Sequence, residues 1–170
     1  MSRWYEGIRE ESSNIIYSRI RLARNWDEYV FPSRLSEQAA SQVTEQLREG
    51  LKEAKTGEHP LLWNDLAAMN GAQKQALRER RILNRTAVEK NGPGGLYLSE
   101  AESCSMLLGA DDHIRIQFLA PGLDLEDLWK KADQMDDFIN ERFSYAFDEK
   151  YGYLTTFPTN VGTGLKACVV

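Results

Sequence analysis

Apolar and polar residues alternate in one early segment of the chain, as they do in a half-buried β-strand. The segment is NIIYSRIRLARN, residues 14–25. Alternation places Arg19 and Arg21 on one face and Ile20 and Leu22 on the other. The apolar face would pack on a core, so the strand is expected to present two guanidinium groups on its opposite face.

Three later segments are predicted helices, the first and third because their apolar residues recur at helical spacing and the second because it is rich in Gln, Ala, Leu, Glu and Arg. The first follows Ser33 and Ser36, either of which could cap it, and the second covers residues 72–81. The third is the longest, and we expect Asp124 to cap it and Gly152 to end it. Its apolar stripe consists of Leu125, Leu128, Trp129, Ala132, Met135, Ile139, Phe143, Ala146 and Phe147. The sequence therefore predicts three helices, of which the first and the third are amphipathic.

The turn cluster NGPGG at residues 91–95 precedes three short apolar runs, LYLS, SCSMLLG and HIRIQF. Polar stretches separate these runs, which is typical of an antiparallel meander. The last twenty residues add a short strand, a loop rich in Pro and Gly, and a final apolar run. Residues 60–69 contain a short apolar run that could form either a strand or a helix. The predicted class is α+β, an antiparallel β-sheet flanked by helices.

Composition indicates one folded domain over residues 1–170, with 42% hydrophobic and 28% charged residues. The net charge of -5 argues against a broad surface for nucleic acid or for an anionic membrane, so any anion site must be local. The polar N-terminus and the lack of a long apolar run predict neither a signal peptide nor membrane insertion. Two cysteines and two histidines suit a reducing cytoplasm and predict no protein-ligated metal site.

Arginine residues on the predicted strands are candidates for a polyphosphate site. Arg19, Arg21 and Arg24 lie on or just after the first strand, and Arg115 lies on the HIRIQF strand. A guanidinium can bond two phosphate oxygens at once, and phosphoryl transfer is catalysed mainly by positioning and by charge stabilisation. Spacing alone favours the alternative, a solvated strand face paired with some of the 26 acidic residues.

Asp111 and Asp112 stand directly before the HIRIQF strand, where a carboxylate could hold a guanidinium through two hydrogen bonds. Adjacent acidic residues at such a place also mark a turn, and His113 suits a structural hydrogen bond. The loop PTNVGTG at residues 158–164 could direct backbone amides at an anion or simply form a turn. The residues alone leave these alternatives open.

Three motifs, SRIRLARN, DDHIRIQ and GYLTTFPTNVGTGLKA, together resemble the phosphagen (ATP:guanidino) kinase family, and most closely its bacterial protein-arginine kinases. The resemblance extends from about Ile15 to the last residue. It implies the front part of a catalytic domain, so we expect one incomplete domain over residues 1–170. It also implies transfer of the γ-phosphoryl group of ATP, with Mg²⁺, to a guanidino substrate, which is protein arginine in the bacterial type.

The resemblance assigns roles by position. Asp111 falls where the family has a catalytic glutamate, and its side chain is one methylene shorter. The residues implied to bind the nucleotide are Ser18, Arg19, Arg21, Arg81, Arg115 and Lys166. Lys166 replaces a family arginine and Phe157 replaces a family cysteine. These departures favour an alternative, a catalytically impaired pseudokinase or interaction module that binds nucleotide or phosphoarginine. A third hypothesis is a homodimer formed through an exposed sheet edge.

Overall fold

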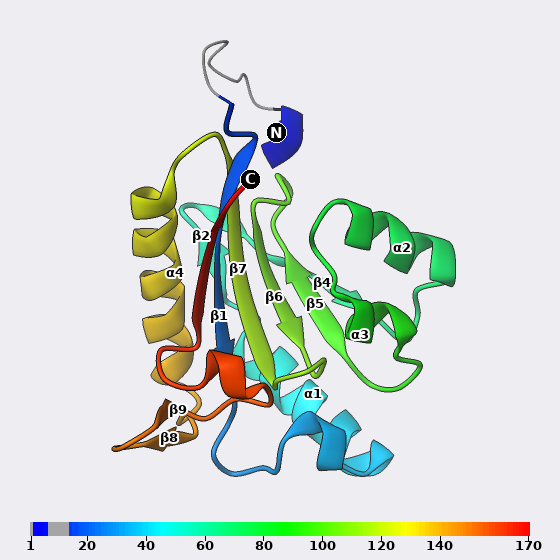
Figure 1. The fold of residues 1–170 in the computed structure, drawn as a ribbon. Coiled ribbons are helices and arrows are strands. Elements are labelled where there is room, and N and C mark those ends of the chain that lie inside the picture. Colours follow the sequence, from blue (N-terminus) through cyan, green and yellow to red (C-terminus); the bar gives the residue numbers. More distant parts are fainter. Residues whose placement is uncertain (1, 7–13) are drawn as a thin grey trace.

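The architecture is an antiparallel β-sheet with helices on both faces (Figure 1). The computed structural model describes residues 2–6 and 14–170. Within these residues the main sheet has six strands, and every neighbouring pair is antiparallel. In spatial order the strands are β10 (Leu165–Val169), β1 (Tyr17–Arg24), β7 (Ile114–Pro121), β6 (Cys104–Leu108), β5 (Gly95–Leu98) and β4 (Leu62–Asp65). The predicted class is confirmed.

The described part of the chain has four α-helices, namely α1 (Glu37–Gly50), α2 (Gly71–Glu79), α3 (Arg85–Glu89) and α4 (Leu125–Asn140). Its short elements are η1 (Trp4–Glu6), η2 (Pro32–Arg34), β2 (Lys55–Thr56), β3 (His59–Pro60), β8 (Phe147–Asp148), β9 (Gly152–Tyr153) and η3 (Pro158–Asn160). None of the helices described is both long and apolar enough to cross a membrane.

Each face of the sheet buries its own apolar cluster. On one face, α1 and α4 pack on Ile20, Leu22, Met106, Ile116 and Phe118, among others. On the other face, the helices α2 and α3 contribute Leu77 and Ala87, which pack with Leu96, Leu107 and Leu119 of the sheet. Figure 1 shows α4 beside the sheet on one side and α2 with α3 on the other. The period-2 pattern of β1 and β7 fixes which side chains point to which helices.

Side-chain caps begin the predicted helices α1 and α2. Ser36 Oγ accepts a hydrogen bond from the Ala39 amide at 3.2 Å, which satisfies one of the free amides of the first turn of α1. Asn70 and Gln73 form a reciprocal capping box at the start of α2. Both predicted helices are confirmed, and Ser36 is the cap of the first.

The long third helix is shorter than predicted. It ends at Asn140 because the chain turns there, and Phe143 packs edge-on against Trp26 with ring centroids 4.8 Å apart. Phe147 belongs to the hairpin β8–β9 and is 58% exposed, so the apolar stripe does not extend that far along a helix. The Asp124 side chain makes no cap hydrogen bond, contrary to expectation. Part of residues 60–69, for which the sequence favoured neither strand nor helix, forms the strand β4.

Candidate functional site

The register of the sheet gathers cationic residues on the face that carries α2 and α3. Arg21 lies directly opposite Lys166 of β10 and Gln117 of β7. Residues paired in this way share a face of the sheet, as do residues two apart on one strand. Arg19 is two residues from Arg21, and Arg115 is two residues from Gln117. Four cations from three strands therefore project from one face.

A cavity of about 260 Å³ lies at this face. It is lined by Arg21, Leu22, Ala23, Asn84, Ala110, Asp111, Asp112, Arg115, Phe157, Thr159, Asn160, Gly164 and Lys166. These residues come from three strands, from the segments before α3 and β7, and from the region of η3. The cavity thus combines three cations with two carboxylates and one aromatic ring.

The cations of the site are partly desolvated and repel one another. Burial lowers the pKa of Arg115 to about 10, and the neighbouring Arg21 adds to this effect. Burial also lowers the pKa of Arg21, with repulsion from Arg19 as the next cause. Arg21 and Arg115 nevertheless stay charged near neutral pH. The buried Nε atoms of Arg19 and Arg115 have no hydrogen-bond partner among the described residues. An anion in the cavity would relieve this repulsion.

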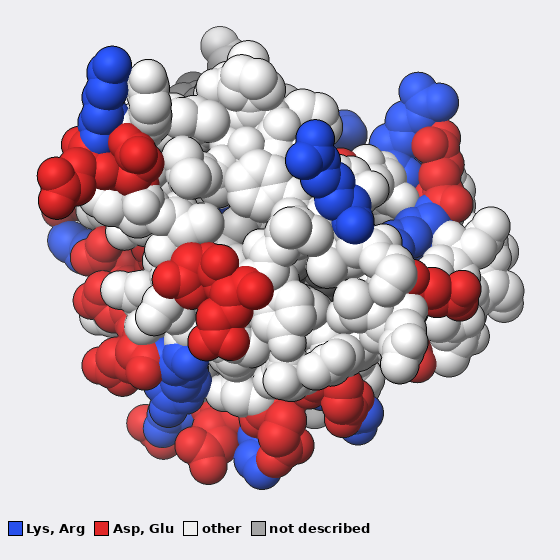
Figure 2. All heavy atoms as spheres, turned by 90° about the horizontal axis from the view of Figure 1, so that it is seen from below, with Lys and Arg blue, Asp and Glu red and all other residues white. Residues whose placement is uncertain are grey.

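The positive charge of the cavity is local. Figure 2 shows the molecule from below, where acidic side chains cover much of the left and lower parts of the surface and separate Lys and Arg side chains lie among largely uncharged areas. The chain as a whole carries a net charge of -5. Such a surface does not attract polyanions over long distances, so the cations of the cavity must act on a bound anion at short range.

Asp111 is the acidic residue held at the edge of the cavity by two other segments. Asn84 Nδ2 donates a hydrogen bond to Asp111 Oδ2 at 2.5 Å. Thr156 Oγ1 donates to the Asp111 carbonyl at 2.7 Å. The attraction of Asp111 partly offsets the lowering of the Arg115 pKa. A carboxylate and several guanidinium groups therefore face the same space, as a phosphate donor and a cationic acceptor would require.

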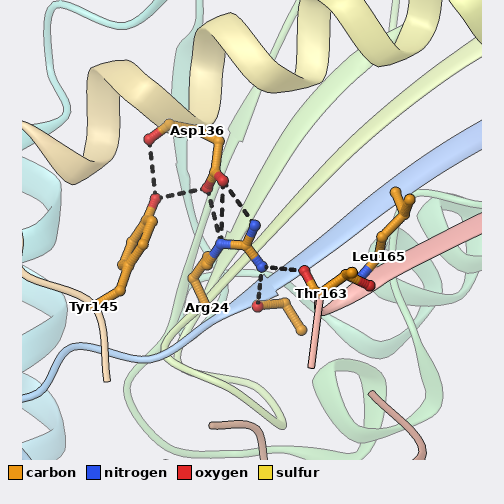
Figure 3. Close-up of polar contacts among 6 residues, drawn as sticks. Arg24, Asp136, Tyr145, Thr163 and Leu165 are labelled. Carbon is orange, nitrogen blue, oxygen red and sulfur yellow. Dashed lines mark hydrogen bonds and ion pairs between the residues drawn. The ribbon is translucent and has the colours of Figure 1, made fainter. Parts of the chain in front are cut away.

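Arg24 does not belong to this group of cations, although it lies on the same strand. Its Nε and Nη2 donate to Asp136 of α4, with Nη2 2.7 Å from Oδ2, and its Nη1 donates to the Ala23 and Thr163 carbonyls at 2.9 Å each (Figure 3). The guanidinium also lies 3.7 Å from the centroid of the Tyr153 ring. Arg24 is 3% exposed and connects β1, α4 and the loop before β10.

A family comparison decides the assignment. The family described as ATP:guanido phosphotransferase, C-terminal catalytic domain, matches residues 42–170. The chain belongs to the ATP:guanido phosphotransferase family. The protein-arginine kinase of Bacillus subtilis is 42% identical over 176 residues, and that of Symbiobacterium thermophilum is 38% identical over 171 residues. The matches cover 100% and 99% of this chain but only 47% and 48% of those proteins. The chain therefore spans about half the length of these curated relatives.

Solved structures of guanidino kinases share the fold. A taurocyamine kinase from Schistosoma mansoni with bound transition-state-analogue components superposes with a TM-score of 0.85 at 24% identity, over 96% of this chain and 24% of that one. Lombricine kinase superposes with a TM-score of 0.79 at 19% identity, over 91% of this chain and 47% of that one. At these identities the likeness establishes the fold alone.

Most of the site residues assigned by resemblance to this phosphotransferase family lie together. Arg21, Arg115, Lys166 and Asp111 line the cavity, and Arg19 is close enough to affect the pKa of Arg21 and Arg115. Phe157, which stands where the family has a cysteine, also lines the cavity, and this residue is 47% exposed. The convergence that the resemblance implied is present in the geometry.

Three assigned residues, Ser18, Arg19 and Arg81, are not among those that line the cavity, and of these Arg19 lies near the cavity cations. Ser18 is on the opposite face of the sheet, where its Oγ accepts a hydrogen bond from the Asp124 amide at 2.9 Å. Arg81 has an exposed side chain, a φ of 70°, and a carbonyl that accepts a hydrogen bond from Gln117 Nε2 at 2.7 Å. The structure therefore does not bring Ser18 or Arg81 to the other site residues, and we leave both out of the proposed site.

Asp112 and His113 have the structural role that the sequence left open. Asp112 Oδ1 accepts hydrogen bonds from Asn25 Nδ2 at 2.7 Å and from the Thr156 amide at 2.8 Å. His113 Nδ1 accepts a hydrogen bond from the Trp26 amide at 3.0 Å. These bonds hold the segment before β7 against the end of β1. Asp111 is thereby positioned by the two residues that follow it in sequence.

Sequence reasoning missed Asn84, which lines the cavity and bonds to Asp111. Its Oδ1 accepts a hydrogen bond from the Ala87 amide at 2.9 Å and caps α3. An asparagine before a short run of helix-forming residues is a cap signal that could have been read. No local signal in the sequence reveals that the Asn84 side-chain NH₂ group faces the carboxylate of Asp111, 27 positions away.

The buried His113 is expected to make stability depend on pH. Burial lowers its pKa from 6.5 to about 4, so the unfolded chain binds a proton at a higher pH than the folded chain. This contribution to stability is complete above pH 6.5 and is lost as the pH falls to 4. The loss is about 1.4 kcal/mol per pH unit within that window.

Urea unfolding of the parent and of His113→Asn across this pH range tests the prediction. Asparagine keeps an acceptor for the Trp26 amide but does not titrate. The difference in unfolding free energy between the two proteins should shrink as the pH falls. A difference that stays constant with pH would contradict the assignment.

Proposed function

We propose that this chain forms part of the catalytic site of a protein-arginine kinase, which transfers the γ-phosphoryl group of ATP to an arginine side chain of a protein. The observation that carries the proposal is the convergence of Arg21, Arg115 and Lys166 with Asp111 at one cavity. The family membership and the names of the bacterial relatives, protein-arginine kinase, support the choice of reaction and substrate.

The cations would bind the phosphates of ATP. Arg21 and Arg115 offer planar donor groups that suit phosphate oxygens, and Lys166 adds a point charge from the neighbouring strand. Their positions are fixed by the sheet, so little reorganisation is needed when charge moves onto the transferred group. Such fixed charges stabilise the transition state of phosphoryl transfer more than mobile ones do.

Asp111 would hold the arginine substrate. Its carboxylate can accept hydrogen bonds from the guanidinium and direct one nitrogen toward the γ-phosphorus. In the reaction a nitrogen–phosphorus bond forms, the bond from the γ-phosphorus to the bridging oxygen of ADP breaks, and the attacking nitrogen loses a proton. Asp111 would accept that proton. The Phe157 ring lines the same cavity and offers an aromatic face to the cationic substrate.

Magnesium would enter the site with the nucleotide. The described residues contain no group of three or more His, Cys, Asp and Glu side chains that could hold a metal ion. Mg²⁺ in kinases is held largely by substrate phosphates and water, which such a site can accommodate. The ion would neutralise phosphate charge, while the arginines orient the nucleotide. We place the reaction in the bacterial cytoplasm, where the free thiols Cys104 and Cys168 stay reduced.

Two measurements test the proposal. Calorimetry with Mg²⁺ and ATP tests nucleotide binding by the 170-residue chain, and mass spectrometry tests for phosphoarginine on a protein substrate after incubation with the complete gene product. We expect binding in the first and phosphoarginine in the second. Binding without phosphoarginine would favour the impaired pseudokinase, and absence of ATP binding would overturn the proposal.

A further inference from the structure

One short segment touches both the cationic and the acidic part of the cavity. Ile82 accepts a hydrogen bond through its carbonyl from Arg115 Nη2 at 2.7 Å. Two residues later, Asn84 donates to Asp111 Oδ2 at 2.5 Å. The spacing between the phosphate-binding side and the guanidinium-binding side of the site is therefore set by the backbone between Ile82 and Asn84.

The orientation of the Asn84 amide follows from its second hydrogen bond. Its Oδ1 accepts from the Ala87 amide at 2.9 Å, as the cap of α3. A backbone amide can only donate, so the oxygen of the side chain must face α3 and the NH₂ group must face Asp111. The helix cap thus makes Asn84 an obligatory donor to the carboxylate.

This bond leaves one oxygen of Asp111 for another partner. Within the described parts of the chain, Oδ2 bonds to Asn84, while Oδ1 has no hydrogen-bond partner. The backbone of Asp111 is held separately by Thr156. An aspartate held at its carbonyl and at one carboxylate oxygen loses most of its rotational freedom, so its other oxygen has a fixed direction.

We propose that Asn84 is a positioning residue, which holds Asp111 Oδ2 so that Oδ1 meets the guanidinium of the substrate. The inference rests on the proposed function and extends it to a residue that does not touch the reacting atoms. Asp111 has a short side chain, and an error of about 1 Å in its placement can cost about 100-fold in rate. A donor fixed by a helix cap supplies this placement.

The test compares Asn84→Ser with Asn70→Ser. Serine is a good helix cap, so both variants keep a cap oxygen, but only the first removes a donor to Asp111. In the complete gene product, we expect Asn84→Ser to lower kcat for arginine phosphorylation by about 10- to 100-fold, with the KM for ATP unchanged. Asn84→Asp should lose more, because it places a second negative charge beside Asp111. Asn70→Ser should keep parental kcat.

A binding measurement separates this inference from the proposed function. Calorimetry with an arginine-containing peptide and the 170-residue chain should show affinity reduced about tenfold in Asn84→Ser, with Mg–ATP affinity unchanged. If the parent binds the peptide without phosphorylating it, the proposed function fails and the peptide affinities alone decide the role of Asn84. Equal behaviour of Asn84→Ser and Asn70→Ser in both assays would overturn the inference, as would a parent that binds no arginine peptide.

Discussion

Replacement of Arg115 by alanine is expected to lower kcat for arginine phosphorylation by about a thousandfold or more. Arg115 lines the cavity, its Nε lacks a hydrogen-bond partner in the described structure, and Ile82 fixes the other side of its guanidinium. The alanine variant would lack a preorganised hydrogen-bond donor to phosphate, at a guanidinium that burial partly desolvates. Mg–ATP affinity of the 170-residue chain, measured by calorimetry, should fall with it.

Two further variants separate charge from structure. Arg115→Lys keeps the charge but loses the planar fork, so we expect a smaller loss than with alanine. Gln117→Ala is the matched structural control, because Gln117 lies two residues along the same strand and also bonds to the segment before α3, through the Arg81 carbonyl. If Gln117→Ala impairs ATP binding as strongly as Arg115→Ala, the effect comes from the segment and not from the guanidinium.

The alternation of residues along the first strand predicted much of this arrangement. It placed Arg19 and Arg21 on the face opposite Ile20 and Leu22, and the structure has them there. The same alternation separates Ser18 from the arginines, since it puts Ser18 on the face of Ile20. The resemblance grouped Ser18 with the arginines although strand alternation puts it on the other face, and in the structure Ser18 lies on that other face.

Other features depend on contacts between distant parts of the chain. The end of α4 at Asn140 follows from the packing of Phe143 on Trp26, which the helical spacing of the apolar residues does not contain. The bond between Asn84 and Asp111 likewise joins segments whose proximity is set by the sheet and by α3. Local pattern predicts elements and faces, and tertiary packing then decides where an element stops and which polar groups meet.

The position of Arg24 depends both on the local strand pattern and on tertiary packing. The sequence grouped it with Arg19 and Arg21 as a cation of one cluster, yet an even-numbered position places it on the face of Ile20 and Leu22. There it meets Asp136 of α4, and Tyr145 donates a further hydrogen bond to the same carboxylate at 2.9 Å (Figure 3). Burial, followed by the charge of Asp136, raises the pKa of Tyr145, so the phenol stays protonated as a donor. Arg24 is thus a structural cation.

We expect Arg24→Met to lower the free energy of unfolding by about 3–5 kcal/mol, because it leaves Asp136 as a buried carboxylate without its cation. The Arg24 and Asp136 side chains are 3% and 13% exposed. Lys130→Met, at an exposed ion pair with Glu126 on the same helix, should cost less than about 1 kcal/mol in urea unfolding.

A second substitution, Asp136→Leu, should recover most of the stability lost in Arg24→Met, because replacing both members of a buried pair removes the unpaired charge. The double variant should still bind Mg–ATP less tightly than the parent. Arg24 Nη1 holds the Thr163 carbonyl next to Gly164, and this segment leads directly into Lys166 at the cavity. If Arg24→Met costs no more stability than Lys130→Met, the ion pair does not hold α4 to β1, and the position of Lys166 must depend on the sheet register alone.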